Sequence, residues 1–327
     1  MVGPGHPALI LAEVGFNFND DYDIAHRLID EAANAGADVI KFQTYTASGH
    51  VSARADHDQW AALCHTELPR ERHRELMEHV QQTGCVFMST PSDEADVDFL
   101  EELDVPAFKL GSDDCSNYQY LRYIARKGRP MIVSTGTCNL SEVHGAVEAV
   151  RGEGNDDLVL MQCTTSYPSE VQYANLRAIE TMQRAFQVPV GYSDHTLGLA
   201  AIGGAVALGA CAIEKHSTYD VDAPGPDHVL SSDIDEFRAR VQTVRDVEAA
   251  MGSGVKEPAA IEAPMLKSFR KSVVAQVDIV AGTRIAADMV TVKRPAAGIA
   301  AKFYDQVVSR VAGVDIPADE PITWELV

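Results

Sequence analysis

The chain has 327 residues, 46% of them hydrophobic and 23% charged, which predicts a globular protein with one large core and a smaller second one. Its formal net charge of -21 argues against a nucleic-acid partner, because a phosphate backbone binds basic surfaces. The sequence has no apolar run of about 18 residues that would cross a bilayer, and its first residues lack the pattern of a secretory signal, so we expect a cytoplasmic protein without membrane contact.

Short apolar runs alternate with amphipathic, helix-like stretches over most of the chain. The runs lie at 8–14, 37–43, 85–90, 106–111, 130–135, 158–164, 188–193 and 210–216. They are rich in Val, Ile and Leu, as is typical of parallel strands covered on both faces. The stretches between them carry helix signals, such as Gly36 for a C-cap and Ser141 for an N-cap. Eight such units predict an α/β fold, the TIM (β/α)8 barrel.

A second, smaller part follows the barrel pattern. The segment GSGVKEPAAIEAP is rich in Gly, Pro and Ala and predicts a linker or a surface crossing. The remaining sequence has the pattern of short strands joined by turns. We therefore expect a catalytic barrel at residues 1–252, a linker at 253–266 and a small β-rich domain at 267–327.

Polar residues follow the apolar runs at their C-terminal ends, which meet at one rim of a barrel, where active sites are built. His195, in VGYSDHT, and His216, in CAIEKHS, end consecutive runs. Two imidazoles at one rim suit a divalent ion such as manganese, iron, cobalt or zinc, with other positions left to water or substrate oxygens. The alternatives are a polar residue at a helix start for His195 and a partly buried strand-end histidine for His216.

Lysines and carboxylates at the same rim indicate an anionic substrate. Lys41 and Lys109 interrupt apolar strands, where an unpaired ammonium costs on the order of several kcal/mol, unless each side chain instead reaches out to solvent. Glu13 ends the first run, and Asp227 follows a Pro-Gly-Pro sequence, as a carboxylate over the site or as a simple turn residue. Hydroxyl groups that can donate to phosphate oxygens recur at Thr90, Ser112, Ser134, Thr165 and Ser193.

These cassettes, in this order, resemble the sialic acid (N-acetylneuraminate) synthase family, which condenses phosphoenolpyruvate with an N-acylated amino-hexose. The likeness covers nearly the whole chain and runs through AEVGFNFN, AGADVIKFQTY, FMSTPSDEADVDFL, FKLGSDD, GRPMIVSTGT, QCTTSYP, VGYSDHT, ALGACAIEKH, APGPDH and VKRPAAGI. The resemblance implies a TIM barrel joined to a C-terminal antifreeze-like (SAF) domain. It also implies a domain-swapped homodimer, in which that domain covers the active site of the partner subunit.

Carried over by position, the resemblance implies a role for each motif residue. His195 and His216 would bind a divalent ion, usually manganese, with magnesium or cobalt as substitutes. The residues implied for phosphoenolpyruvate are Lys41, Thr90, Lys109, Ser112, Ser134 and Ser193. Those implied for the sugar and the attacking water are Glu13, Gln43, Tyr167 and Asp227, and Arg294 would reach from the partner subunit to the N-acyl group. In this reaction the aldehyde is polarised by the ion, C3 of the enol phosphate attacks it, and phosphate leaves by C–O cleavage.

Four departures from the family pattern concern the acceptor sugar. Phe18 replaces a histidine at the rim, Asp114 a glutamate, Thr165 an asparagine found in some members, and Ala296 a glycine. The acceptor is therefore open between an N-acetylmannosamine-type hexosamine and a dideoxy, diacetamido sugar, as in legionaminic or pseudaminic acid synthesis. Two other hypotheses are a metal-dependent TIM-barrel hydrolase, for which the sequence lacks an HxH pair after the first strand, and a carbohydrate- or ice-binding domain on a vestigial barrel.

Overall fold

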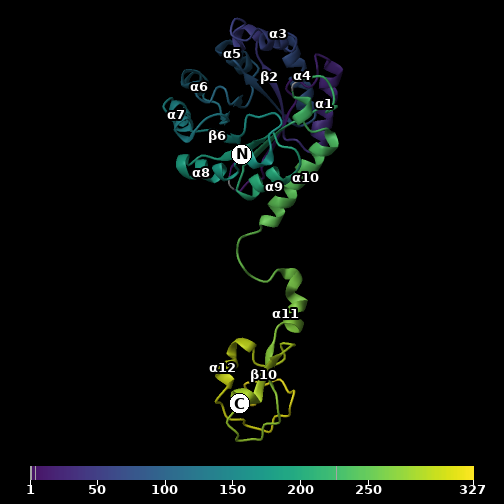
Figure 1. Cartoon of the computed structure of the whole chain (residues 1–327), viewed down its shortest axis with the longest axis vertical. Helices are drawn as coiled ribbons and strands as arrows, with labels where there is room; N and C mark the ends of the chain where they lie inside the picture. The colour runs from purple at the N-terminus through teal and green to yellow at the C-terminus, as the bar shows by residue number, and fades with distance from the viewer. Residues whose placement is uncertain (1, 4, 226) are drawn as a thin grey trace. The chain divides into compact units, whose positions relative to one another are not determined.

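The computed structural model describes residues 2–3, 5–225 and 227–327. The chain divides into two compact units, residues 1–252 and 253–327. In the first unit, helices surround the strands (Figure 1). Its strands are β1 (Leu9–Glu13), β2 (Val39–Thr44), β3 (Val86–Pro91), β4 (Phe108–Leu110), β5 (Met131–Ser134), β6 (Leu158–Cys163), β7 (Val190–Asp194) and β8 (Ala212–His216). Each predicted apolar run contains one of these strands.

The helices of the first unit alternate with its strands. They are α1 (Tyr22–Ala35), α2 (Ala47–His50), α3 (His57–Cys64), α4 (Arg70–Gln82), α5 (Glu94–Glu102), α6 (Tyr118–Ala125), α7 (Leu140–Arg151), α8 (Arg177–Phe186), α9 (Ala200–Ala207) and α10 (Ile234–Met251). Short 3-10 turns lie at η1 (Val171–Tyr173) and η2 (His228–Leu230). Among the described residues, no helix is long and apolar enough to cross a membrane.

The eight strands form one parallel sheet in the order β3-β2-β1-β8-β7-β6-β5-β4. Strands β3 and β4, at the two ends of this order, lie beside each other, although the described residues form no hydrogen-bonded ladder between them. The sheet is therefore a nearly closed barrel, and the predicted (β/α)8 fold is confirmed.

The interior of the barrel has an apolar layer below a polar one. Strand residues Leu11, Val39, Met88, Ile132, Met161 and Ala212 form a small apolar cluster inside the barrel. Two residues further along β1, β2 and β8, the same side of the wall carries Glu13, Lys41 and Glu214. Because side chains alternate along a strand, an apolar floor and a polar rim come from one short run. The residues that point outward pack against the helices in the larger core.

Capping explains where two of the predicted helix ends lie. Gly36 ends α1 with a left-handed φ of 98°, as predicted. Helix α7 begins after Asn139, whose side chain accepts hydrogen bonds from the backbone N–H groups of Ser141 and Glu142. Glu142 accepts in return from the Asn139 N–H, which completes a capping box. The predicted N-cap at Ser141 was therefore wrong by two residues.

The second unit is small and has its own core. It contains η3 (Ala260–Glu262), α11 (Ala263–Phe269), β9 (Ser272–Ala275), η4 (Ala287–Met289), β10 (Val290–Lys293), η5 (Ala301–Phe303) and α12 (Tyr304–Val307). Strands β9 and β10 pair antiparallel. Val273, Ile279, Ile285, Ile316 and Ile322 are among the residues that form its buried cluster. With one two-stranded sheet and many turns, this unit agrees with the predicted pattern of short strands joined by turns.

Gly191 in β7 provides a test of barrel packing. A Cβ atom at this position would lie 2.5 Å from Met161 Sδ and 2.7 Å from the carbonyl oxygen of Ala212. We expect Gly191→Ala to lower the free energy of unfolding by about 1–3 kcal/mol, because the neighbouring β8 backbone cannot move aside. Gly203 in α9 is the matched control: a Cβ there meets nothing closer than 3.7 Å, so Gly203→Ala should raise stability by up to about 1 kcal/mol. Urea unfolding followed by circular dichroism measures both, and equal midpoints for the two variants would contradict this account.

Candidate active site

A cavity of about 480 Å³ lies at the C-terminal ends of the barrel strands. Every site residue predicted in the first unit lines it: Glu13, Lys41, Gln43, Thr90, Lys109, Ser112, Asp114, Ser134, Thr165, Tyr167, Ser193, His195, His216 and Asp227. Pro226, next to Asp227 in the Pro-Gly-Pro sequence, lies outside the described residues. A second hollow of about 610 Å³ adjoins this cavity at Cys163 and Thr165, but Arg177 is the only charged residue described in its lining, so its chemistry is limited.

Glu214 is the main functional residue that the sequence reasoning missed. Its carboxylate lies on the cavity floor between two lysines, 3.2 Å from Lys109 Nζ and 3.5 Å from Lys41 Nζ. Lys41 also contacts the carboxylate of Glu13, and all four side chains are buried. The lysines therefore do not reach out to solvent, and part of their charge is balanced within the protein.

The two carboxylates of this cluster differ in protonation. Burial raises the pKa of Glu13 to about 7, against the opposing effect of Lys41. Burial also disfavours the charged form of Glu214, but the ammonium groups of Lys109 and Lys41 outweigh it and hold the pKa of Glu214 well below its ordinary value. Near neutral pH, Glu214 is ionised and Glu13 carries a proton part of the time. The cluster is then neutral or positive, which suits an anionic ligand.

Hydroxyl groups surround the lysines. Lys41 Nζ donates to Thr90 Oγ1 over 3.0 Å, and Lys109 Nζ donates to Ser134 Oγ over 2.8 Å. A hydroxyl that accepts from an ammonium keeps its own hydrogen free to donate elsewhere. The backbone N–H of Gly136 donates in the same way to Ser112 Oγ over 3.0 Å. The Thr90 and Ser134 hydroxyls are therefore free to donate to the oxygens of a phosphate or carboxylate in the cavity, whereas Ser112 Oγ also lies 3.0 Å from Cys163 Sγ.

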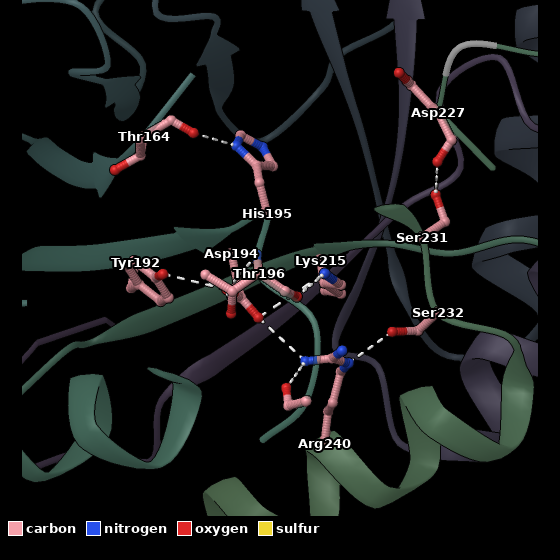
Figure 2. A network of polar contacts seen from close by, with 11 residues as sticks. Thr164, Tyr192, Asp194, His195, Thr196, Lys215, Asp227, Ser231, Ser232 and Arg240 are labelled. Atoms are coloured by element: carbon pink, nitrogen blue, oxygen red, sulfur yellow. Dashed lines mark hydrogen bonds and ion pairs between the residues drawn. The ribbon is translucent and has the colours of Figure 1, made fainter. Parts of the chain in front are cut away.

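The two predicted histidines lie side by side, with ring centroids 5.6 Å apart. His195 Nδ1 lies 2.8 Å from the carbonyl oxygen of Thr164, as Figure 2 shows. A carbonyl only accepts, so Nδ1 carries the hydrogen and Nε2 keeps a free lone pair. The His216 side chain is 12% exposed, and its buried Nδ1 has no hydrogen-bond partner among the described residues. Burial lowers the pKa of both imidazoles, and the neighbouring His195 lowers that of His216 further.

Two neutral, adjacent imidazoles fit a divalent metal ion, because the neutral ring is the form that binds metals. Within the part of the chain that the structure describes, no group of three or more His, Cys, Asp or Glu residues is arranged to hold an ion. His195 and His216 would supply two nitrogen ligands to such an ion and leave other positions to water or substrate oxygens.

Tyr167 and Asp227 complete the rim beside the histidines. The Tyr167 ring lies 4.4 Å from the His195 ring, centroid to centroid, and is half-exposed. Asp227 Oδ2 lies 3.4 Å from His216 Nδ1. Burial raises the pKa of Asp227 to about 6. Asp227 is thus a second carboxylate, besides Glu13, that changes protonation near neutral pH.

The loop after β1 places its two phenylalanines differently from the expectation. Phe18 was expected at the rim but is buried in the core, where its ring centroid lies 5.9 Å from that of Tyr22, and Phe16 lines the cavity instead. Asn17 explains this, because its amide donates to the Ser217 carbonyl and the Ser231 hydroxyl and so fixes the loop.

Arg294 belongs to the second unit, where its guanidinium lies over the ring of Phe269.

Other cavity residues were also missed by the sequence reasoning. His50, Gln59, Ala62 and Leu63 line the cavity. They come from α2 and α3, which have no counterpart in the simple strand-helix alternation. Glu214 had a usable signal, since it is a charged residue within an apolar strand, two positions before His216 and on the same side of the barrel wall.

Comparison with known proteins gives relatives over the whole chain. A model of the NeuB family matches residues 28–256, and a model of the SAF domain matches residues 270–327. The chain is 39% identical over 339 residues to an N,N'-diacetyllegionaminic acid synthase of Legionella pneumophila, covering 99% of this chain and 95% of that protein. It is 38% identical over 304 residues to an N-acetylneuraminate-9-phosphate synthase of Mus musculus, covering 89% and 84%.

A solved structure agrees with these relatives. The N-acetylneuraminic acid (sialic acid) synthetase of Leptospira borgpetersenii superposes with a TM-score of 0.75 at 33% identity, covering 81% of this chain and 92% of that one. The resemblance predicted from the sequence motifs is thus confirmed at the level of the family and of the two-part architecture. The chain belongs to the NeuB family and carries a SAF domain after its barrel.

Proposed function

We propose that this enzyme condenses phosphoenolpyruvate with the open-chain form of an N-acyl hexosamine of the N-acetylmannosamine type, giving a sialic-acid-like nonulosonate and phosphate. The observation that carries the proposal is one cavity that joins a lysine-hydroxyl anion site to two adjacent neutral histidines. Relatives named as synthases of sialic and legionaminic acids support the same reaction class. The cytoplasm is the proposed location.

Phosphoenolpyruvate would bind over the lysine cluster. Lys41 and Lys109 supply positive charge, and Thr90 and Ser134 present hydroxyl hydrogens that the ammonium groups leave free. Ser112 and Ser193 extend this set around the cavity wall. Since Glu214 pairs with both lysines on the floor, their ammonium groups are held at fixed places, and a fixed array of charges needs little reorganisation during the reaction.

His195 and His216 would hold a divalent ion, with manganese as the proposed metal and magnesium or cobalt as substitutes. When bound, the ion would act as a Lewis acid on the aldehyde oxygen of the sugar. The chain contributes two neutral imidazoles, and the hydrogen bond from His195 Nδ1 to the Thr164 carbonyl fixes the orientation of one of them. The bond from C3 of phosphoenolpyruvate to the sugar carbonyl carbon then forms beside the rim.

A carboxylate would finish the reaction by taking a proton from water. Attack by C3 turns the aldehyde oxygen into an alkoxide, which takes up a proton, and leaves cationic charge at C2. Water adds to C2 as the carboxylate takes one of its protons, which gives a tetrahedral carbon bearing a hydroxyl and the phosphate. The bond between C2 and the bridging oxygen then breaks, phosphate leaves with the electron pair, and loss of the hydroxyl proton leaves a ketone at C2. Glu13 and Asp227 both line the cavity, and burial raises the pKa of each toward neutrality, which suits a general base. The geometry leaves both as candidates.

A panel of sugars tests the proposed reaction. We expect phosphate release from phosphoenolpyruvate only when an N-acyl aldose is present, with N-acetylmannosamine and a dideoxy, diacetamido sugar as the two candidates and unacylated mannosamine as the control. EDTA and His195→Ala should each stop the release, since both remove the proposed ion. An 18O label in the bridging oxygen should appear in phosphate. Absence of turnover with every aldose would refute the proposal.

The pH profile tests the general base. Only an ionised carboxylate accepts a proton, so kcat should fall as the pH drops through about 7 if Glu13 is the base, or through about 6 if Asp227 is. Protonation removes the base, so the rate falls toward low pH. Because the pKa values are raised, this fall occurs at a higher pH than for an exposed carboxyl group. The pH profiles of Glu13→Gln and Asp227→Asn should differ. Only the substitution that replaces the true base should abolish the fall of kcat at low pH. Unchanged rates and limbs in both variants would exclude a carboxylate base.

Arg294 would act across a homodimer. We propose that the SAF domain of one subunit covers the cavity of the other, and that Arg294 contacts the N-acyl group there. Arg294→Ala should then raise KM for the sugar by roughly 10-fold or more, the loss of one charge-assisted hydrogen bond, and leave KM for phosphoenolpyruvate nearly unchanged. Lys293→Ala is the matched control, because this exposed neighbour pairs with Asp319. Equal sugar KM values in wild type and Arg294→Ala would contradict the assignment.

A further inference from the structure

A buried polar network lies behind β7 and β8, on the helix side of the barrel wall (Figure 2). Asp194, Lys215 and Arg240 are only 0%, 2% and 4% exposed. Asp194 and Lys215 directly precede the two cavity histidines, and strand alternation turns them away from the cavity toward α10. Charged groups this deep in the wall require partners within the protein.

Arg240, on α10, contacts three separate segments of the chain. Its Nη1 lies 3.1 Å from Asp194 Oδ2 and also donates to the carbonyl oxygen of Gly198, and its Nε donates to Ser232 Oγ over 2.6 Å. A planar guanidinium with several donors can bridge three acceptors in a fixed geometry. Arg240 therefore ties the end of β7 to the segment that follows β8.

The first of these contacts leads to His195. Asp194 Oδ1 accepts from the backbone N–H of Thr196 over 3.0 Å and from its hydroxyl over 2.7 Å. These bonds join the residue before His195 to the residue after it. Lys215 Nζ donates to the carbonyl oxygen of Thr196 over 2.8 Å, which links the same turn to β8. Figure 2 shows this turn between Arg240 and the His195 ring.

The second contact leads to His216 and Asp227. The backbone N–H of Ser232 donates to the carbonyl oxygen of His216 over 2.9 Å, and the neighbouring Ser231 hydroxyl donates to the carbonyl oxygen of Asp227. Through Ser232, Arg240 thus reaches the backbone of the second histidine. The Arg240 side chain is therefore linked through Asp194 to the turn that carries His195, and through Ser232 to the backbone of His216.

A stability role alone explains this network poorly. Two cations surround one carboxylate, with Lys215 Nζ 3.9 Å and Arg240 Nη1 3.1 Å from Asp194 Oδ2, so the described cluster carries excess positive charge in the interior. Buried ion pairs are often no more stabilising than well-packed apolar residues of similar volume. Their specific contribution is geometry, and here the fixed geometry is that of the two histidine-bearing strand ends.

We propose that Arg240 is a positioning residue, which holds the strand ends so that the imidazoles of His195 and His216 face one site. This inference rests on the proposed function, in which the two histidines hold a divalent ion. Loss of a residue that orients metal ligands typically weakens metal binding about 10- to 100-fold. Arg240 does not line the cavity, so its effect on phosphoenolpyruvate binding is expected to be smaller than its effect on the ion.

The test compares Arg240→Met, Arg240→Lys and Ser232→Ala in the full chain. Mn2+ titration by electron paramagnetic resonance should give a dissociation constant raised about 10- to 100-fold for Arg240→Met, with partial recovery in Arg240→Lys. Ser232→Ala keeps the Arg240–Asp194 pair and the backbone hydrogen bond from residue 232 to His216, and it removes only the hydrogen bond from Arg240 Nε to the Ser232 hydroxyl. This variant tests the positioning role if Arg240→Met does not fold. Arg238→Met is the matched control, since Arg238 lies on the exposed side of α10 and pairs with Asp235.

A second readout needs no metal. The imidazole nitrogen NMR signals of His195 and His216 in the metal-free protein should both shift in Arg240→Met, and those of His216 should shift in Ser232→Ala. Both sets should stay unchanged in Arg238→Met. Unchanged histidine signals and unchanged Mn2+ affinity in a folded Arg240→Met would overturn the positioning role, even if its melting temperature fell. Absence of Mn2+ binding in the wild type would instead refute the proposed metal site, and the NMR comparison would then decide the role of Arg240 alone.

Discussion

The structure depends on one geometric constraint: along each barrel strand, successive side chains point to opposite sides of the wall. In β8 this alternation sends Glu214 and His216 into the cavity and Lys215 toward the helices, near Asp194 of β7. One short polar stretch therefore provides both the cavity groups and the groups that support them. A register shift of one residue would exchange the two sets and place the lysine inside the cavity.

The same constraint explains how a protein with a net charge of -21 can form an anion site. Lys41 and Lys109 come from strands that are not neighbours in the sheet, and Glu214 forms an ion pair with each of them inside the barrel. Because Glu214 stays ionised while burial favours the protonated form of Glu13, the cluster gains positive charge when Glu13 binds a proton. Attraction for an anion is thus local, and the surrounding protein screens it less than water would.

The sequence predicted what is encoded locally and missed what depends on strand register. Apolar runs marked all eight strands, and polar residues at their ends marked the cavity. The pairing of Glu214 with Lys109 was not predictable, because β8 and β4 are distant in the sheet order and meet only across the barrel. Phe18 was misplaced because the loop that carries it is fixed by hydrogen bonds from the Asn17 amide to Ser217 and Ser231, which are about 200 residues away in the sequence. The network of Arg240 likewise depends on how α10 packs against β7 and β8.

The distribution of these residues bears on how one family can serve different acceptors. Lys41, Lys109 and Glu214 lie within strands, where neighbouring ladders fix the backbone, whereas Asp114 and Thr165 lie in loops after the strands. Loops tolerate sequence change more readily than the strands that carry them. Relatives named for sialic and legionaminic acid synthesis are 38% and 39% identical to this chain, which leaves room for such change. Under the proposed reaction, a rigid strand-borne site would keep the phosphoenolpyruvate chemistry constant, while the loops and Arg294 select the sugar.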